Sequence, residues 1–502
     1  ANVALSPDGL SIVSSGRLWD LSTSSLLRTF EGMSDSSRGV AISPDGKYVF
    51  SQSSDMPLAL WDMATGKAVK EIQTPNLVAA AAFTPDGKFV LTGESDKTLK
   101  LWDVSRKFRG IVAGDIVKGS AAQKAGLLPG DVIVSVDGVA MNTWSQFVSL
   151  ISESPDKTLT LAVGRGEKIF QVNVAPAAVT VEDDDGKKRT IGRVGISLGS
   201  EKRDRVFEGH SRAIKSLAIS SDGRYGVSAT GYDPAKLWDI ETGKEIRTFL
   251  TINAILKKAE NASLAGISPD GRRVITAGSA YNAPPIQLWD AESGALIRAF
   301  GDASHSTSSW IWDLAFTPDG RFAISAGGDK LIRLWDVDQG EEVRIFAGHT
   351  GAIRSIAVSR DGNRLLSGSN DGTTRLWDVA TGREIAQFVI FLDGEWVVIT
   401  PEGYFNASPG GAKHLNVRVG MHVYSIDNFY EKFFNPVYVA SVLQGKKAEG
   451  VADIRRGIQS PPDVRIVSPQ PGAVLMTDTL TIKVAAKDTG GGIDEIRLYH
   501  NG

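Results

Sequence analysis

The chain of 502 residues is long enough for about three domains of ordinary size and for a large buried core. Its net charge of −3 and pI near 6.2 argue against a nucleic-acid or membrane-surface binder, because such proteins usually carry a basic excess. The lack of cysteine excludes disulfides, thiolate metal sites and cysteine nucleophiles from these residues. No apolar run approaches the ~20 residues that a membrane-spanning helix needs.

The two ends of the chain suggest that it is part of a longer protein. It opens on ANVALSPDG, which has neither an initiator methionine nor a signal-peptide pattern. It stops at RLYHNG, inside an apparent strand. We therefore expect further residues on both sides.

A short motif recurs from the first residues to Phe388. Leu-Trp-Asp occurs seven times, and an Asp-Gly turn precedes each occurrence, as in SPDG at Ser6. The runs between turn and tryptophan, such as RLLSGS and TTRLWDV, are rich in β-branched and apolar residues bounded by Gly, Asn and Asp. Each repeat thus predicts four short antiparallel strands. The tryptophans are Trp19, Trp61, Trp102, Trp238, Trp289, Trp335 and Trp377.

A sheet of four short strands is too thin to bury its own faces, and radial packing of such sheets solves the problem. The motif, with its period of 41 or 42 residues where undisturbed, resembles the WD40 repeat family. The resemblance implies a mainly β fold with a seven-bladed β-propeller. An eighth blade built from Glu395 to Ala407 is the alternative. We interpret the repeated tryptophans and aspartates as blade core and turn hydrogen bonding.

In the WD40 family a histidine, a Ser or Thr, a turn aspartate and the tryptophan form a buried polar chain. We interpret the matching residues as structural, because a fully satisfied polar network makes a core rigid, and we do not read them as a Ser-His-Asp triad. The fifth repeat, SAYNAPPIQLWD, has no turn aspartate and should have a partial network. The matching residues are His210, Ser228, Asp233 and Trp238 in one repeat and His349, Ser367, Asp371 and Trp377 in another.

The interval between Trp102 and Trp238 exceeds one repeat by about 94 residues, the size of a small domain. LWDV precedes the extra residues and RVFEGH follows them, so they should join the third and fourth strands of one blade at a surface turn. Their pattern predicts an α+β module. It comprises a strand in GIVAGDIV, a short helix in AAQKAG, a strand in DVIVSVDG, an amphipathic helix in WSQFVSLISES, a hairpin and the final IGRVGISL.

Through GSAAQKAGLLPGDVIVSVDG and the later GRVGI, residues 107–200 resemble the circularly permuted PDZ domains of bacterial site-2 proteases. The resemblance implies that a peptide adds a strand to the sheet, with its terminal carboxylate on backbone N–H groups and its last side chain in an apolar pocket. A degenerate or covered groove is the alternative. The implied loop is Gly192, Arg193, Val194, Gly195 and Ile196, with Phe147, Val148 and Ile151 as pocket candidates on one helix face.

The acidic run EDDDGKKR, from Glu182 to Arg189, lacks the alternating spacing of calcium ligands. We interpret it as a solvated turn, and expect neither a metal site nor a cofactor in the chain.

After the last repeat, the pattern predicts a hairpin in DGEWVVITPEGYFNASPGG, then one or two aromatic-rich helices, then the first strands of an immunoglobulin-like sheet. This order resembles large bacterial proteins that continue into a caspase-like peptidase. The Cys and His pair of such a peptidase would lie beyond these residues. The expected domains are 1–106 and 201–390 for the propeller, 107–200 for the insert, 391–458 for the linking segment and 459–502 for the immunoglobulin-like part.

We expect a protein-binding scaffold without a catalytic constellation of its own. Peptide C-termini would bind the insert, and other protein surfaces would bind a propeller rim with long loops at Leu250 to Ser263 and Gly301 to Trp312. A purely structural assembly subunit and a hydrolase using the propeller channel are the alternatives. The small apolar first strands NVALS, AISPDG, AAAF and SLAIS disfavour channel chemistry. The PDZ resemblance favours a location outside the bacterial cytoplasm, and the sequence leaves this open.

Overall fold

The computed structural model describes most of the chain, and two compact units emerge from its internal contacts. One unit comprises residues 1–21 and 26–384, and the other comprises residues 22–25 and 385–502. Each unit is treated by itself below. The described residues are 2–33, 38–52, 58–72, 76–104, 110–141, 143–165, 168–182, 188–198, 203–253, 258–260, 262–278, 286–301, 311–419, 421–446, 463–468 and 482–487.

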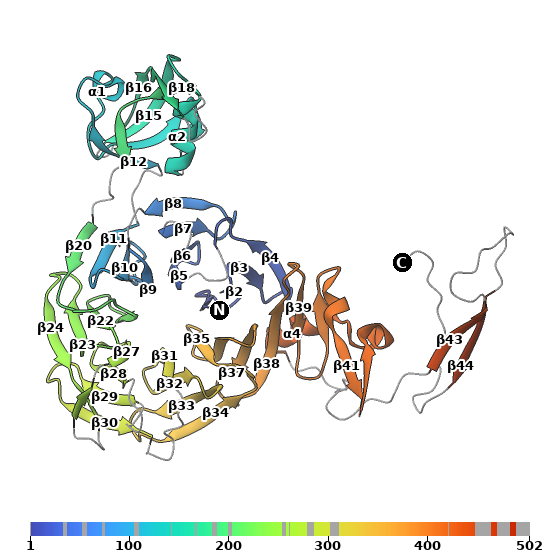
Figure 1. Ribbon diagram of the computed structural model, residues 1–502. Coiled ribbons are helices and arrows are strands. Elements are labelled where there is room, and N and C mark those ends of the chain that lie inside the picture. The colour runs from blue at the N-terminus through green and yellow to red at the C-terminus, as the bar shows by residue number, and fades with distance from the viewer. Residues whose placement is uncertain are drawn as a thin grey trace. The chain divides into compact units, whose positions relative to one another are not determined.

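The repeats form antiparallel sheets whose strands follow one another in space as in the chain (Figure 1). The first three are β1 (Val3–Leu5), β2 (Ser11–Ser14), β3 (Arg17–Asp20) and β4 (Ser25–Thr29); β5 (Arg38–Ile42), β6 (Tyr48–Gln52), β7 (Leu58–Asp62) and β8 (Ala68–Ile72); and β9 (Val78–Phe83), β10 (Phe89–Glu94), β11 (Leu99–Asp103) and β20 (Arg203–Phe207).

The next three sheets have the same order. They are β21 (Ser216–Ile219), β22 (Tyr225–Ala229), β23 (Ala235–Asp239) and β24 (Glu245–Phe249); β27 (Ala262–Ile267), β28 (Arg273–Gly278), β29 (Ile286–Asp290) and β30 (Leu296–Phe300); and β31 (Ile311–Phe316), β32 (Phe322–Gly327), β33 (Leu331–Asp336) and β34 (Glu342–Ala347). The last sheet begins with β35 (Ile353–Val358), β36 (Arg364–Ser369) and β37 (Thr373–Asp378) and continues into β38 (Glu384–Ile390), β39 (Trp396–Ile399) and β40 (Phe405–Ala407).

The first strands of these sheets line up into a closed ring. β1 contacts β5, and the contacts continue through β9, β21, β27, β31 and β35, which contacts β1 again. This arrangement confirms the expected mainly β propeller architecture. Seven of the described sheets take part in the ring of contacts. The hairpin from Glu395 to Ala407, considered as part of an eighth blade, instead extends the sheet of β38.

The hydrophobic core lies between neighbouring sheets, as the thinness of each sheet requires. In four of the sheets a phenylalanine at or next to the end of the outer strand packs against the tryptophan of the next sheet. Phe207 and Trp238 have ring centroids 5.9 Å apart, and Phe346 and Trp377 lie 6.0 Å apart. These four side chains are almost fully buried. The repeated Trp therefore serves packing between blades.

The inserted residues lie between two strands of one sheet that pair with each other. β11 and β20 pair antiparallel, with Leu99 opposite Phe207 and Leu101 opposite Arg205, although about a hundred residues separate them in the chain. Trp102 and Trp238 belong to neighbouring sheets, since β9 contacts β21.

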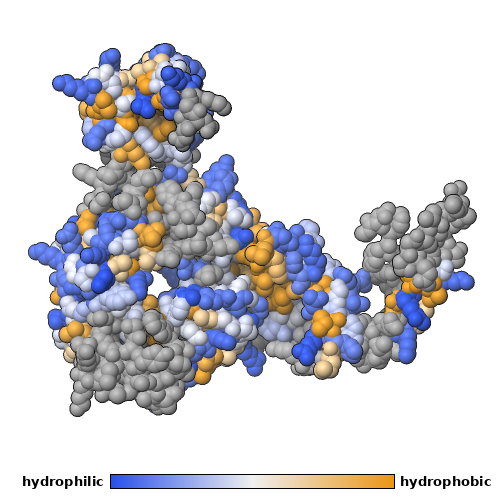
Figure 2. Space-filling model, viewed as in Figure 1, coloured by the Kyte–Doolittle hydropathy of each residue, from blue (hydrophilic) through white to orange (hydrophobic). Residues whose placement is uncertain are grey.

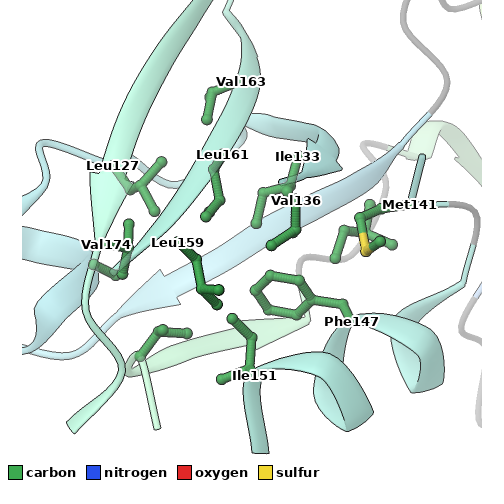
Figure 3. Close-up of a cluster of buried hydrophobic side chains, with 13 residues drawn as sticks. Leu127, Ile133, Val136, Met141, Phe147, Ile151, Leu159, Leu161, Val163 and Val174 are labelled. Atoms are coloured by element: carbon green, nitrogen blue, oxygen red, sulfur yellow. The ribbon is translucent and has the colours of Figure 1, made fainter. Parts of the chain in front are cut away.

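The insert has a five-strand path, β16-β15-β13-β12-β19, with β14 beside β13 and a separate β17-β18 hairpin. Its elements are β12 (Ile111–Ile116), α1 (Ala121–Lys124), β13 (Val132–Val136), β14 (Val139–Ala140), α2 (Trp144–Ser152), β15 (Leu159–Arg165), β16 (Lys168–Val174), β17 (Ala177–Glu182), β18 (Lys188–Arg193) and β19 (Ile196–Leu198). Its core is its own: Figure 3 shows Phe147 and Ile151 of α2 pointing toward Ile133, Val136 and Leu159 of the sheet.

The second unit contains short elements after β38. They are η1 (Gly411–His414), β41 (Asn416–Val419), β42 (His422–Ser425), η2 (Ile426–Asn428), α3 (Tyr430–Phe433), α4 (Pro436–Leu443) and the paired strands β43 (Asp463–Ser468) and β44 (Lys483–Lys487). In the first unit, the expected long loop after Leu250 contains a hairpin of β25 (Thr251–Asn253) and β26 (Lys258–Glu260). Residues 302–310 of the other expected loop lie outside the described residues.

Candidate peptide-binding site

The loop between β18 and β19 turns at Gly195, whose φ is +76°. A Cβ added there would lie 2.4 Å from the Cβ of Ser120, so the position requires glycine. The carbonyl of Gly195 accepts a hydrogen bond from the Val117 N–H at 2.9 Å, and the carbonyl of Val194 accepts one from the Ala122 N–H at 2.9 Å. Both carbonyls therefore bind the α1 segment.

The backbone N–H of Gly195 points the other way. Within a planar trans peptide group the N–H is directed opposite to the C=O, and the carbonyl of that group belongs to Val194. Among the described residues, none accepts a hydrogen bond from the Gly195 N–H. A donor of this kind can bind the carboxylate of a ligand.

The strand that follows the loop lies at an edge of the sheet. β19 pairs with β12 through Ala113 opposite Leu198 and Ile116 opposite Ile196. No other described strand pairs with β19. The free edge of such a strand offers N–H and C=O groups to an added strand.

The predicted residues occupy different environments. Gly192 packs against the C-terminal end of α2, where an added Cβ would lie 2.3 Å from the Ile151 carbonyl oxygen. Phe147 and Ile151 are 1% and 4% exposed and belong to the core, whereas Val148 is 41% exposed. The three helix residues therefore do not share one face, because the core takes positions 147 and 151 and leaves 148 to solvent.

The pocket beside the loop lies on its α1 side. It has a volume of about 530 Å³ and is lined by Arg193, Val194 and Gly195 together with Ser120, Lys124, Asp156 and Asn173, among others. No residue of α2 lines it. Ser120 and Lys124, which the sequence analysis did not select, thus lie beside the predicted loop. On the visible face of the insert, hydrophilic and hydrophobic residues are interspersed (Figure 2).

In the last repeat the structure brings the four predicted network residues together. His349 lies between Asp371, 2.9 Å from its Nδ1, and Ser367, 2.7 Å from its Nε2. The indole N–H of Trp377 donates to the same Ser367 hydroxyl at 2.8 Å. Burial lowers the pKa of His349. Burial opposes ionisation of Asp371, but hydrogen bonds from Thr373, Thr350 and His349 outweigh it and hold its pKa far below the usual range.

The fourth repeat has the same arrangement, but its aspartate lies farther from the histidine Nδ1. Ser228 lies 2.8 Å from His210 Nε2 and accepts the indole N–H of Trp238 at 2.8 Å. Asp233 lies 3.3 Å from His210 Nδ1 and accepts the N–H of Ser211 at 2.7 Å. Ser228, like Ser367, is 0% exposed, so a substrate cannot reach either hydroxyl. The geometry fits a network that holds a blade together.

Two polar groups in the propeller were missed in the sequence. Lys100 is buried between Glu94 and Asp96 in the third repeat, where Asn76 also binds both acids. Asp313 lies on the first strand β31 and accepts the N–H of Ile356 from the next sheet at 2.7 Å. The first strand β31 thus carries a buried acid, in contrast to the small apolar first strands NVALS, AISPDG, AAAF and SLAIS.

The described residues contain no group of three or more His, Cys, Asp or Glu side chains that could hold a metal ion. Most of the acidic run from Glu182 to Arg189 (positions 183–187) lies outside the described residues. The turn of the fifth repeat, within 279–285, also lies outside them. No described helix is long and apolar enough to cross a membrane.

Comparison with known families agrees with this architecture. The model of the WD domain, G-beta repeat, matches residues 66–103, 201–239, 297–336 and 340–378. A PDZ domain model matches residues 112–165, and a bacterial Ig domain model matches residues 462–502. The WD40 and PDZ matches support a role as a protein-interaction scaffold.

Curated relatives cover separate parts of the chain. Cilia- and flagella-associated protein 52 of Chlamydomonas reinhardtii is 31% identical over 169 residues, 34% of this chain and 25% of that protein. The regulator of sigma-W protease RasP of Bacillus subtilis is 38% identical over 89 residues, 18% of this chain and 20% of that protein. Nuclear distribution protein PAC1 of Arthroderma otae is 30% identical over 142 residues, 27% of this chain and 29% of that protein. The chain thus spans less than a third of the length of each of these relatives.

Proposed function

We propose that this chain is a protein-binding scaffold whose PDZ domain captures the C-terminus of a peptide by strand addition at β19. The observation that carries the proposal is the combination of an edge strand and the Gly195 loop, whose carbonyls bind α1 while the Gly195 N–H is directed away from it. An incoming strand would pair with β19, and its carboxylate would lie at that N–H. Arg193, which is exposed beside the loop, adds a positive charge.

The experiment uses the full chain and a display library of peptides with free C-termini. Selected peptides are measured by fluorescence polarisation with a free and with an amidated terminus. We expect amidation to weaken binding at least tenfold, because the carboxylate loses charge-assisted hydrogen bonds.

Arg193→Glu tests the loop, and Lys168→Glu on the exposed start of β16 is the matched control. We expect only Arg193→Glu to weaken binding. The loss should be about three- to tenfold, because a single exposed charge near the carboxylate is changed. Equal affinity for free and amidated peptides would contradict capture of a C-terminus.

We further infer that the chain is the regulatory region of a larger bacterial protein with a caspase-like peptidase. Support comes from the order of propeller, the segment EWVVITPEGYFNAS and the bacterial Ig match. The complete coding sequence tests this inference. It should continue into a domain with a Cys and His pair, and a different domain there would contradict the inference.

A further inference from the structure

The pocket on the α1 side of the loop between β18 and β19 contains charges of both signs. Its volume of about 530 Å³ is in the range of small-molecule sites. The α1 segment contributes Ser120 and Lys124 to its lining, whereas the connection after α2, the strand β16 and the strand β18 contribute Asp156, Asn173 and Arg193. The other lining residues are glycine, alanine and valine. The charged groups of the pocket are therefore two cations and one carboxylate.

These three charged side chains do not pair with one another. The ion pair in the described part of the insert joins Arg165 to Asp131, and neither of these residues lines the pocket. One carboxylate oxygen of Asp156 accepts the N–H of Ala178 at 3.3 Å. The side chains of Lys124, Asp156 and Arg193 are exposed. Opposite charges that line one cavity without contact leave space for a ligand that contacts both.

Charged residues beside the pocket do not reverse its sign. Lys118 and Lys157 directly adjoin lining residues in the chain, and the acids Asp115 and Glu153 lie within four positions of them. None of these four side chains lines the pocket, and their charges balance. The lining itself thus carries one net positive charge.

The polar residues of the lining supply hydrogen-bond donors. The Ser120 hydroxyl oxygen accepts the N–H of Gln123 at 3.3 Å and keeps its own proton for donation. The side-chain oxygen of Asn173 accepts the hydroxyl of Thr160 at 3.1 Å, which leaves the amide NH₂ as a donor. Donors beside two cations fit carboxylate oxygens on a ligand.

We propose that this pocket binds an acidic amino acid or the acidic end of a short peptide, a ligand with two carboxylates and one ammonium group. Lys124 and Arg193 bind the carboxylates, and Asp156 binds the ammonium group. The net charge of −1 on such a ligand complements the lining. A phosphate or a simple dicarboxylate would instead place a negative charge beside Asp156. The inference goes beyond capture of a C-terminus at β19.

The test uses the full chain and isothermal titration calorimetry with L-glutamate. Glutarate lacks the ammonium group, and L-glutamine lacks one carboxylate. We expect glutamate to bind about three- to tenfold more tightly than either comparison ligand, because each of them loses one exposed charge contact. Absence of glutamate binding, or equal affinities for glutamate and glutarate, would overturn the proposal.

Two variants separate the charges of the pocket, and both leave Arg193 in place because it lies beside the β19 site as well. Asp156 has φ +56°, a conformation that asparagine tolerates. Asp156→Asn should weaken glutamate binding about three- to tenfold and leave glutarate binding equal or tighter, since it removes a repulsive charge. Lys124→Gln should weaken binding of both ligands. Equal effects of Asp156→Asn on the two ligands would contradict the assignment.

Lys157→Gln is the matched control. It removes a positive charge next to Asp156 in the chain but outside the lining, so that glutamate affinity should change by less than about twofold. A loss as large as that of Lys124→Gln would show a general charge effect and overturn the site.

The dipeptide γ-glutamylalanine separates the two sources of the ligand, because it keeps two carboxylates and one ammonium group on a longer frame. Tighter binding of the dipeptide assigns the pocket to peptide ends, and tighter binding of glutamate assigns it to the free amino acid. Both results support the shared chemistry. A peptide selected for the β19 site is measured in parallel. Lys124→Gln should change its affinity by less than about twofold, so that failure of this pocket and failure of C-terminal capture are distinguishable.

Discussion

At the scale of single residues, the hydroxyl of Ser367 connects two buried groups. It accepts the indole N–H of Trp377 and bonds with the imidazole of His349. None of the three side chains is accessible to water to a significant extent. Loss of the hydroxyl would therefore leave two polar groups unpaired in a low-dielectric interior, where each costs more than in water.

We expect Ser367→Ala to lower the free energy of unfolding by about 1–3 kcal/mol, the usual cost of a buried unsatisfied group. Thermal and urea unfolding measure the change. Ser149→Ala, at an exposed position of α2, is the control and should change stability by less than about 0.5 kcal/mol. If both variants unfold alike, the network contributes nothing to stability.

Asp313 lies at the contact between two sheets and makes the stability of the propeller depend on pH. Burial among the first strands raises its pKa to about 6, although N–H groups of Ile356 and Leu314 and the side chain of Ser355 hydrogen-bond to it. The folded protein therefore holds this proton more tightly than the unfolded chain does. Stability gained from protonation is fully present below about pH 4 and is lost as the pH rises through about 6.

We predict that Asp313→Asn removes this contribution to the pH dependence. Between pH 4 and 7 the parent should lose about 1–2 kcal/mol of unfolding free energy from this group, a value reduced for partial access to water. The variant should lack this slope. Denaturant unfolding at several pH values measures the difference, and identical slopes would show that Asp313 does not titrate in this range.

The two residues show what a local pattern can predict. The members of the His349 network were selected through the WD40 resemblance, whose motif lies within one repeat. Asp313 was missed because its environment is formed by Ile356 and Ser355, which belong to another repeat. The dipeptide Trp312-Asp313 also resembles the Trp-Asp of the third-strand motif, although it lies on the first strand β31.

At the scale of elements, basic residues of the outer strands connect consecutive sheets. Lys70 donates to the Asp103 carbonyl at 2.7 Å, Arg205 to the Ile240 carbonyl at 2.6 Å and Arg344 to the Val379 carbonyl at 2.8 Å. In each case the acceptor is the last residue of the third strand of the next sheet or the residue directly after it. A side chain of one blade thus satisfies a backbone group of the next.

The turn from Ser22 to Ser25 departs from this pattern. Its Ser24, five residues after Trp19, has φ +57°, where five other repeats have glycine. In the outer strand β38, the position that corresponds to Lys70, Arg205 and Arg344 lies two residues before Phe388. It is Ala386, which is fully buried and cannot donate a hydrogen bond to this turn from its side chain. Asn406 of β40 donates to the carbonyl and hydroxyl of Ser24 at 3.0 Å and 2.9 Å. The segment after the last repeat therefore supplies the missing contact.

We predict that Ser24→Ala destabilises the protein more than Ser24→Gly. Alanine keeps the left-handed strain and loses the hydroxyl, whereas glycine removes the strain of about 1 kcal/mol. Asn406→Ala should cost about 1–3 kcal/mol, because it leaves the buried Ser24 carbonyl with fewer partners. Melting temperatures of the three variants test this order, and a more stable Ser24→Ala than Ser24→Gly would contradict it.

At the scale of the whole molecule, the PDZ domain is inserted without interrupting its host sheet. Trp102 lies opposite Arg203, as Trp61 lies opposite Ala68 in the second repeat. The short segment Met63 to Lys67 therefore corresponds to everything from 104 to 202. The core of the insert is formed from its own residues.

We expect the propeller to fold after residues 104–202 are replaced by the sequence Met-Ala-Thr-Gly-Lys of the second repeat. Its melting temperature should remain within a few degrees of the parent, because an exposed turn tolerates the exchange of its length. Circular dichroism and calorimetry measure the result. A control with the same turn placed out of register by one residue should be less stable, since the strand would present its other face to the core.

The sequence by itself determined the repeated sheets, because they depend on local turn chemistry and on a period that recurs; from the same signals it predicted the position of the insert and a glycine-dependent loop. Only the tertiary structure decided that Phe147 and Ile151 lie in the core, that β39 and β40 continue the sheet of β38, and that Asn406 holds Ser24. These outcomes depend on which segments distant in the chain compete for the same buried surface and the same backbone groups. No spacing within a single repeat contains that information.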